Sequence, residues 1–172
     1  MAVSAGPDAG GVPEVTMDAE TTAYAIETRS LHVRLVQLSG RSVDGTIFLR
    51  AVSHRRPGPE TLIERLNHEE TRFLPLELEQ IELINLDWIS YLEVEGRAPE
   101  VEEAEQLGME RSPAEIELIS RELFKGELIY LLPEGRNRVS DFLNLSADRF
   151  FLFQSEGFTR YVNRHALVRV RV

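Results

Sequence analysis

Two stretches of this chain, residues 33–94 and 116–172, carry the same succession of motifs. The matched motifs are Gly45–Phe48 with Gly126–Ile129, Leu62–Asn67 with Val139–Asn144, Arg72–Phe73 with Arg149–Phe150, and Ile84–Asn85 with Val162–Asn163. Their separations are 81, 77, 77 and 78 residues, so only the connection after the first hairpin differs appreciably in length. This pattern predicts a duplicated domain. A unit of about 60 residues is only marginally stable alone, so we expect the two repeats to support each other.

The composition is that of an ordinary soluble globular protein. The chain has 172 residues, of which 42% are hydrophobic and 28% are charged, and this predicts one or two domains. No apolar run approaches the roughly 20 residues that a membrane-spanning helix needs, and the N-terminus lacks the basic and apolar regions of a secretory signal. The absence of cysteine excludes disulfides and thiolate metal sites. We therefore expect a cytoplasmic location.

The net charge of −10 is unevenly distributed along the chain. Residues 1–28 carry −5, residues 29–95 carry −3, residues 96–114 carry −3 and residues 115–172 carry +1. The overall sign disfavours binding to nucleic acid and to anionic membranes. The slight excess of positive charge in the last segment leaves a basic surface open as an alternative there.

These differences in composition divide the chain into four parts. Residues 1–28 are acidic and lack periodic hydrophobic residues, which predicts a disordered tail. Residues 29–95 form the first repeat and residues 115–172 the second. Residues 96–114 contain Pro99, Gly108 and Pro113 around an acidic run, which predicts a linker with a short acidic helix at its middle. We expect it to be a solvated spacer, the alternative being an acidic bait for a basic partner.

Each repeat is predicted to contain five short strands, with a helical turn after the second strand. The expected strands are residues 32–38, 43–49, 73–76, 81–84 and 89–94 in the first repeat, and residues 116–118, 126–129, 150–153, 158–162 and 167–172 in the second. Thr61 is a candidate cap for the first helical turn, with Glu64 in the capping-box position. Gly45 and Gly126 mark equivalent bends where a side chain would crowd the neighbouring strand. A mainly β unit of this kind is most economically closed into a small barrel, which removes exposed edges.

The opening strands of both repeats and the closing segment Tyr161–Val168, with its basic-His-Ala-aliphatic turn, resemble Sm-like (Hfq-like) small β-barrels. The opening strands that carry the resemblance are Val33–Leu35 with Gly45–Ile47 and Ile116–Leu118 with Gly126–Leu128. The resemblance implies two tandem five-stranded SH3/Sm-like barrels, ring assembly through edge strands, and RNA binding. The first repeat has Leu86–Ile89 in place of Arg164–Leu167 at the closing turn.

The sequence offers no recognisable catalytic motif. The four histidines, His32, His54, His68 and His165, are scattered, so neither the zinc-protease pattern nor another metal site is expected. There is no glycine-rich phosphate loop and no nucleophile elbow, and the spacing of the carboxylates indicates a solvated face. We therefore expect no enzyme activity, no cofactor and no small-molecule substrate.

Several conspicuous side chains have structural explanations. Asn67 and Asn144 are predicted to bond local backbone where each helical turn ends. Trp88 and the cluster Phe150, Phe151 and Phe153 are predicted to be core and interface residues, rather than a platform on which bases stack.

Two hypotheses for function follow. The favoured one is a protein-interaction or assembly module that binds a protein partner or associates with itself. The alternative is an Sm-like RNA-binding protein that uses the basic C-terminal stretch, with Arg160, Arg164, His165, Arg169 and Arg171 as the binding residues. The negative net charge favours the first, because it gives long-range steering of nucleic acid the wrong sign.

The last strand is predicted to place valines and arginines on opposite faces. Val168, Val170 and Val172 alternate with Arg169 and Arg171. We expect the valine face to be buried in the second repeat. The two arginines then either face solvent, which is the favoured interpretation, or extend a basic patch with Arg164 and His165.

Overall fold

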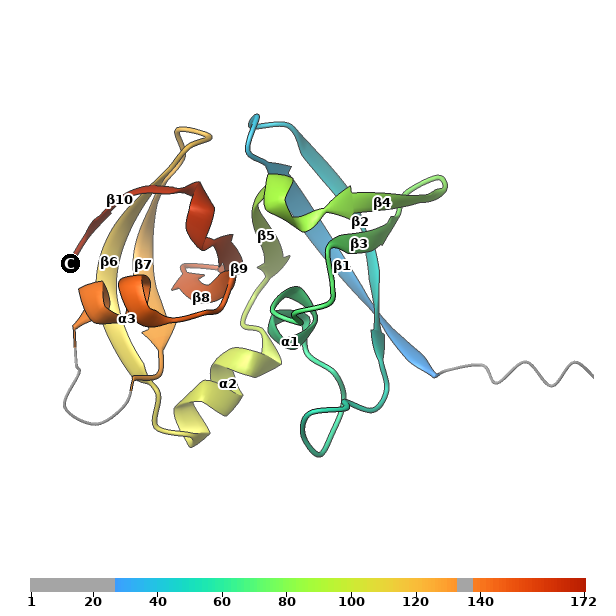
Figure 1. Cartoon of the computed structure of the whole chain (residues 1–172), viewed down its shortest axis with the longest axis horizontal. Coiled ribbons are helices and arrows are strands. Elements are labelled where there is room, and N and C mark those ends of the chain that lie inside the picture. Colours follow the sequence, from blue (N-terminus) through green and yellow to red (C-terminus); the bar gives the residue numbers. More distant parts are fainter. Residues whose placement is uncertain (1–26, 133–137) are drawn as a thin grey trace, which may run out of the picture.

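The computed structural model describes residues 27–132 and 138–172, so most of the predicted N-terminal tail lies outside the described residues. The first repeat contains β1 (Thr28–Gln37), β2 (Ser42–Arg50), α1 (Leu62–Leu66), β3 (Phe73–Glu77), β4 (Ile81–Asn85), the 3₁₀ turn η1 (Leu86–Trp88) and β5 (Ile89–Glu95). After α2 (Pro99–Gln106), the second repeat contains β6 (Glu110–Leu118), β7 (Leu123–Tyr130), α3 (Val139–Leu145), β8 (Phe150–Ser155), β9 (Phe158–Asn163), the 3₁₀ turn η2 (Arg164–Ala166) and β10 (Leu167–Arg171). Both repeats have the predicted order of elements (Figure 1).

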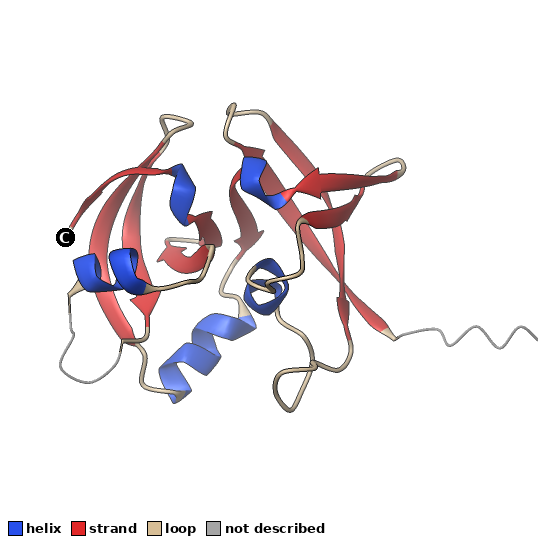
Figure 2. Ribbon diagram, in the orientation of Figure 1, coloured by secondary structure: helices blue, strands red, loops and turns tan. Residues whose placement is uncertain are grey.

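All ten strands belong to one antiparallel sheet, in the order β10-β6-β7-β8-β9-β5-β1-β2-β3-β4. With 50% of residues in strands and 18% in helices, the predicted mainly β class is confirmed (Figure 2). Two separate closed barrels are not confirmed, because the sheet is open and continuous. Within each repeat the last strand returns to pair with the first, and β9 then pairs with β5 of the other repeat. Among the described residues β4 pairs only with β3, and β9 pairs with β5 of the other repeat, so neither repeat closes on itself.

Two equivalent glycines allow the second strand of each repeat to approach the third. Gly45 lies opposite Val33 and Gly126 lies opposite Ala114. A Cβ atom on Gly45 would stand 2.8 Å from the carbonyl oxygen of Glu77, and one on Gly126 would stand closer still to the backbone of β8. Real Cβ atoms do not come so near, so the predicted crowding is confirmed.

The hydrophobic cores of the two repeats interlock. The core of the first repeat includes side chains from the second repeat, namely Ile129, Phe150, Leu152 and Tyr161. The core of the second repeat includes Val36 and Tyr91 from the first. Phe150, Phe151 and Phe153 are all buried, as predicted. Each repeat therefore completes the core of the other, in agreement with the expectation that the two support each other.

The short helix α1 depends on contacts outside itself. Thr61 caps it as predicted, its Oγ1 accepting a hydrogen bond from the Glu64 amide at 3.3 Å. A carboxylate oxygen of Glu100 accepts from the Leu62 amide at 2.8 Å. Leu62 and Leu66 are fully buried. A helix of five residues would not form alone, so α2 helps to hold it in place.

The interval 96–114 is not the solvated spacer that the sequence predicted. A helix does lie at its middle, but α2 buries Val101 and Ala104, which lie three residues apart and therefore share one helix face. Residues 110–114 form the first half of β6, so the second repeat begins before residue 115. The prediction failed because the segment is acidic overall, although a narrow apolar stripe of α2 packs on the core of the first repeat.

Two further expectations about burial are wrong. Trp88 is largely exposed on η1 rather than being part of the core. In β10 a register shift between Leu167 and Arg169 interrupts the alternation, so that Val168 is exposed while Leu167 and Val170 pack on the core. Val172, which follows β10, is exposed as well. An edge strand with a bulge does not bury one face along its whole length.

Candidate interaction surface

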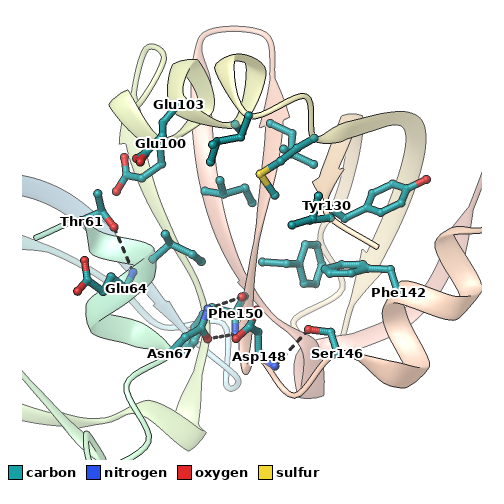
Figure 3. Close-up of a pocket in the computed structure, with 18 of the residues that line it drawn as sticks. Thr61, Glu64, Asn67, Glu100, Glu103, Tyr130, Phe142, Ser146, Asp148 and Phe150 are labelled. Carbon is teal, nitrogen blue, oxygen red and sulfur yellow. Dashed lines mark hydrogen bonds between the residues drawn. The ribbon is translucent and has the colours of Figure 1, made fainter. Parts of the chain in front are cut away.

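A cleft of about 420 Å³ lies between the two repeats. Figure 3 shows Asn67 and Phe150 at one end of it, Glu100 and Glu103 at another, and Tyr130 and Phe142 across from α1. Most of the lining is apolar, contributed by residues Ile63, Ala104, Leu107, Met109, Ile129, Tyr130, Leu131, Phe142, Phe150, Phe151 and Leu152. The shape and lining suit an apolar group.

Three of the charged residues that line this cleft, Arg56, Glu64 and Glu103, form one ion-pair network. Arg56 bonds Glu103 at 2.9 Å and lies 3.6 Å from Glu64, which also accepts a 2.5 Å hydrogen bond from Ser53. None of the four histidines lines the cleft. Within residues 27–132 and 138–172, no cluster of three or more His, Asp or Glu side chains could hold a metal ion.

Asn67 is the C-cap residue of α1, but its side chain joins the two repeats. Its Nδ2 donates to the carbonyl oxygen of Phe150 at 2.9 Å, and its Oδ1 accepts from the Phe150 amide at 2.8 Å. The prediction of a local role is wrong for Asn67, because the neighbouring repeat offers a free backbone pair within reach. The prediction is correct for Asn144, whose Nδ2 donates to the carbonyl oxygen of Ser140 at 2.8 Å.

The junction between β5 and β9 contains the first of the predicted binding residues. Arg160 forms a 2.5 Å ion pair with Glu93, and both side chains are nearly buried. The Arg160 guanidinium also lies 4.0 Å from the centre of the Phe124 ring. Asn163 at the end of β9 donates to the carbonyl oxygens of Leu86 and Ile89, at 3.2 and 2.9 Å. Arg160 therefore holds the repeats together.

The other predicted binding residues do not form one basic patch. Arg164 donates to the carbonyl oxygens of Phe142 and Leu143 at the end of α3, at 3.0 and 2.7 Å, and burial lowers the pKa of its guanidinium. Arg169 pairs with Glu117 at 2.5 Å and Arg171 with Glu115 at 2.6 Å, both on the outer edge of the sheet. The side chain of His165 is exposed. Each arginine of the set thus has a partner within the chain.

An exposed apolar surface lies at the other edge of the sheet. We call it the β3–β4 face, formed by Phe73, Ile81 and Leu83 with Trp88 on the adjoining turn. Pairing places Phe73 opposite Asn85, Pro75 opposite Leu83 and Glu77 opposite Ile81, so these side chains share one side of the hairpin. Each of the four defining side chains is more than half exposed.

The sequence of β3 already indicates this face, although none of its residues was among the predicted binding residues. Residues 73–76 read Phe-Leu-Pro-Leu, and Leu74 and Leu76 fill the core while Phe73 and Pro75 point the other way. A strand that is apolar on both sides is typical of one covered on both faces. The described residues cover only one face.

The part of the chain that the structure describes contains no helix long and apolar enough to cross a membrane. Comparison with known proteins found no matching family model, no matching curated protein and no matching solved structure. The proposed function therefore rests on the geometry of the chain itself.

Proposed function

We propose that this protein is a non-enzymatic protein-interaction or assembly module whose working surface is the β3–β4 face. One observation carries the proposal: the same face of the second repeat is buried. Phe73 is 53% exposed and its equivalent Phe150 is 1% exposed, while Leu83 is 66% exposed and its equivalent Tyr161 is 0% exposed. Burying apolar surface contributes about 25 cal/mol per Å², so a partner that covers this face gains stability from it.

The edge strand beside this face supplies directional bonding as well. Among the described residues β4 pairs only with β3, so one side of its backbone is available to another strand. Added strands bind such edges through backbone hydrogen bonds and gain specificity from alternate side chains. We therefore infer that the partner is a protein that adds a strand next to β4.

We further propose that each repeat is a strongly curved, barrel-like unit related to Sm-like barrels, with the role carried out in the cytoplasm. Pairing of the last strand with the first, and a single 3₁₀ turn before the last strand, support the first part in both repeats. The lack of cysteine supports the second.

RNA binding is the weaker of the two proposals. Affinity for RNA depends on cations that are free to neutralise phosphates. Arg160 and Arg164 have their charge engaged in the interior, and Arg169 and Arg171 have carboxylate partners. These contacts favour the protein-interaction proposal over RNA binding.

In-cell photo-crosslinking tests the proposal. A photo-reactive amino acid replaces Leu83, and in a control variant it replaces Val52, which has similar exposure in the loop after β2. We expect the Leu83 variant to form defined protein adducts and the Val52 variant to form none. Crosslinking no stronger at Leu83 than at Val52 would overturn the proposal.

A further inference from the structure

The cleft between the repeats has the size and the composition of a small-molecule site. Its volume of about 420 Å³ falls within the range of about 300–1,000 Å³ that such sites occupy. Sites of this kind are lined mostly by apolar side chains, with a few polar groups that fix the orientation of the ligand. Figure 3 shows Glu64, Glu100 and Glu103 on one side of the cleft and the rings of Tyr130 and Phe142 on the other.

The aromatic side of the cleft is a firmly packed wall. The rings of Tyr130 and Phe142 are stacked, with their centres 5.3 Å apart and their planes at 28°. Phe142 also meets Phe151 edge-on, at 6.1 Å between ring centres. All three side chains belong to the buried core of the second repeat. An apolar group that enters the cleft therefore meets a surface already held in shape, and it gains stability from the area that it buries there.

The apolar lining continues to the opening of the cleft. Leu107, which follows α2, and Leu131, which follows β7, both line the cleft, and both are more than half exposed. Residues that line a cleft and also face solvent lie where the two meet. A ligand with an extended apolar body would cover them.

The side formed by α1 and α2 carries an excess of negative charge. Three carboxylates line it, those of Glu64, Glu100 and Glu103, together with the guanidinium of Arg56. Arg56 lies 2.9 Å from Glu103 and 3.6 Å from Glu64. This side of the cleft thus already holds one cation and has negative charge left for another.

Glu100 is the carboxylate without a cation. It is only 7% exposed, and its one hydrogen bond is accepted from the Leu62 amide at 2.8 Å. Within residues 27–132 and 138–172 it takes part in no ion pair. Nearby, Glu64 Oε2 is buried and accepts no hydrogen bond from any other described residue. A cation placed beside such carboxylates is attracted strongly, because the interior screens charge less than water does.

We propose that the cleft binds a small amphipathic amine. Its ammonium group lies beside Glu100 and Glu103, which are three residues apart on α2 and therefore share one helix face. Its aliphatic or aromatic body lies along Tyr130 and Phe142 towards the opening. An ammonium group only donates hydrogen bonds, and carboxylate oxygens only accept them. This binding is independent of the partner on the β3–β4 face, so each proposal stands or falls alone.

A titration of the full chain followed by NMR tests the ligand class. Met109 lines the cleft, and the chain has only two other methionines, so Met109→Leu identifies its methyl signal in protein labelled at the methionine methyl groups. Octylamine should shift this signal to saturation. Octanol and octanoate carry the same apolar chain with no charge or with the opposite charge. We expect both to bind at least about tenfold more weakly, because neither offers a cation to Glu100.

Glu100→Gln tests the role of the buried charge. Glutamine keeps an oxygen that can accept from the Leu62 amide, so the contact between α1 and α2 is retained while the charge is lost. We expect octylamine to bind about tenfold more weakly and octanol to bind as before. Glu102→Gln is the matched control, because Glu102 lies on the same helix, is exposed and does not line the cleft. This control should bind octylamine normally.

Circular dichroism and a thermal melt verify that the variants are folded. If Glu100→Gln does not fold, Glu103→Gln takes its place, because the Glu103 side chain is 39% exposed and its loss disturbs the core less. We expect it to weaken octylamine binding about threefold, since a partly exposed charge contributes less than a buried one.

Leu107→Ser tests the apolar part of the site. It should weaken octylamine and octanol alike, about threefold or more, because it removes apolar surface at the opening. Leu123→Ser is its control, because Leu123 is also more than half exposed and does not line the cleft. We expect the control to bind both compounds as the unmodified chain does.

Three results would overturn the proposal. The first is no saturable shift of the Met109 signal up to the solubility limit of octylamine. The second is binding of octanoate or octanol as tight as that of octylamine, which shows that the charge of the ligand is not recognised. The third is an equal loss of affinity in the variants at Glu100 and Glu102, which shows that the overall charge of the chain attracts the amine.

Discussion

The hairpins β3–β4 and β8–β9 have the same pairing pattern and opposite surroundings. Phe150 and Tyr161 on β8–β9 are buried against the first repeat, whereas Phe73 and Leu83 at the same places on β3–β4 face outward. The hairpins differ little in their own architecture, so burial is decided by what lies next to them. The comparison teaches that an apolar face becomes core only where a neighbour supplies the complementary edge.

The sharpest way to break this comparison is to truncate the same side chain in both hairpins. Phe150→Ala removes a fully buried ring from the core and should lower the free energy of unfolding by about 3–5 kcal/mol. Phe73→Ala should change it by less than about 0.5 kcal/mol, because the Phe73 ring is more than half exposed. Urea denaturation of both variants measures the difference. Equal losses would show that the β3–β4 face is already covered within one molecule.

A second test compares the two glycines. Gly126→Ala forces the new Cβ against the backbone of β8 and should cost about 3 kcal/mol of stability, measured as a lower thermal midpoint. Gly45→Ala should cost less, about 1–2 kcal/mol, because two of the three nearest atoms belong to leucine side chains that can shift. A larger loss at Gly45 than at Gly126 would contradict this ranking.

The smallest expected difference concerns the two asparagines. Asn67→Ala leaves the backbone amide and carbonyl of Phe150 without partners and should cost about 1–3 kcal/mol. Asn144→Ala removes one exposed local hydrogen bond and should cost less than about 0.5 kcal/mol. Chemical denaturation at low protein concentration separates the two. If both variants lose the same stability, Asn67 has no special role at the junction.

Local features of the fold were predictable because they depend on neighbouring residues. The helix at residues 62–66 was predicted from its Thr61 cap and apolar spacing, and β3, β4 and β9 were placed to within one residue. Gly45 and Gly126 were identified from their equivalent positions in the two repeats.

The arrangement of the repeats was not predictable in the same way. The alternation of apolar and polar residues along a strand indicates which of its faces is buried, but it does not indicate which strands pair with each other. Pairing between β5 and β9 depends on residues far apart in the chain, such as Glu93 and Arg160. For the same reason Arg160 was predicted as a binding residue when it is an internal ion-pair partner, and α2 was predicted as solvated although Val101 is buried.

The interlocking of the two cores determines how the chain opens. Unfolding of the first repeat would expose Phe150 and Tyr161 of the second, and unfolding of the second would expose Val36 and Tyr91 of the first. Neither repeat can therefore melt while the other stays native, and the segment joining them becomes accessible to a protease only when both come apart. Two repeats in sequence thus behave as one cooperative unit in unfolding.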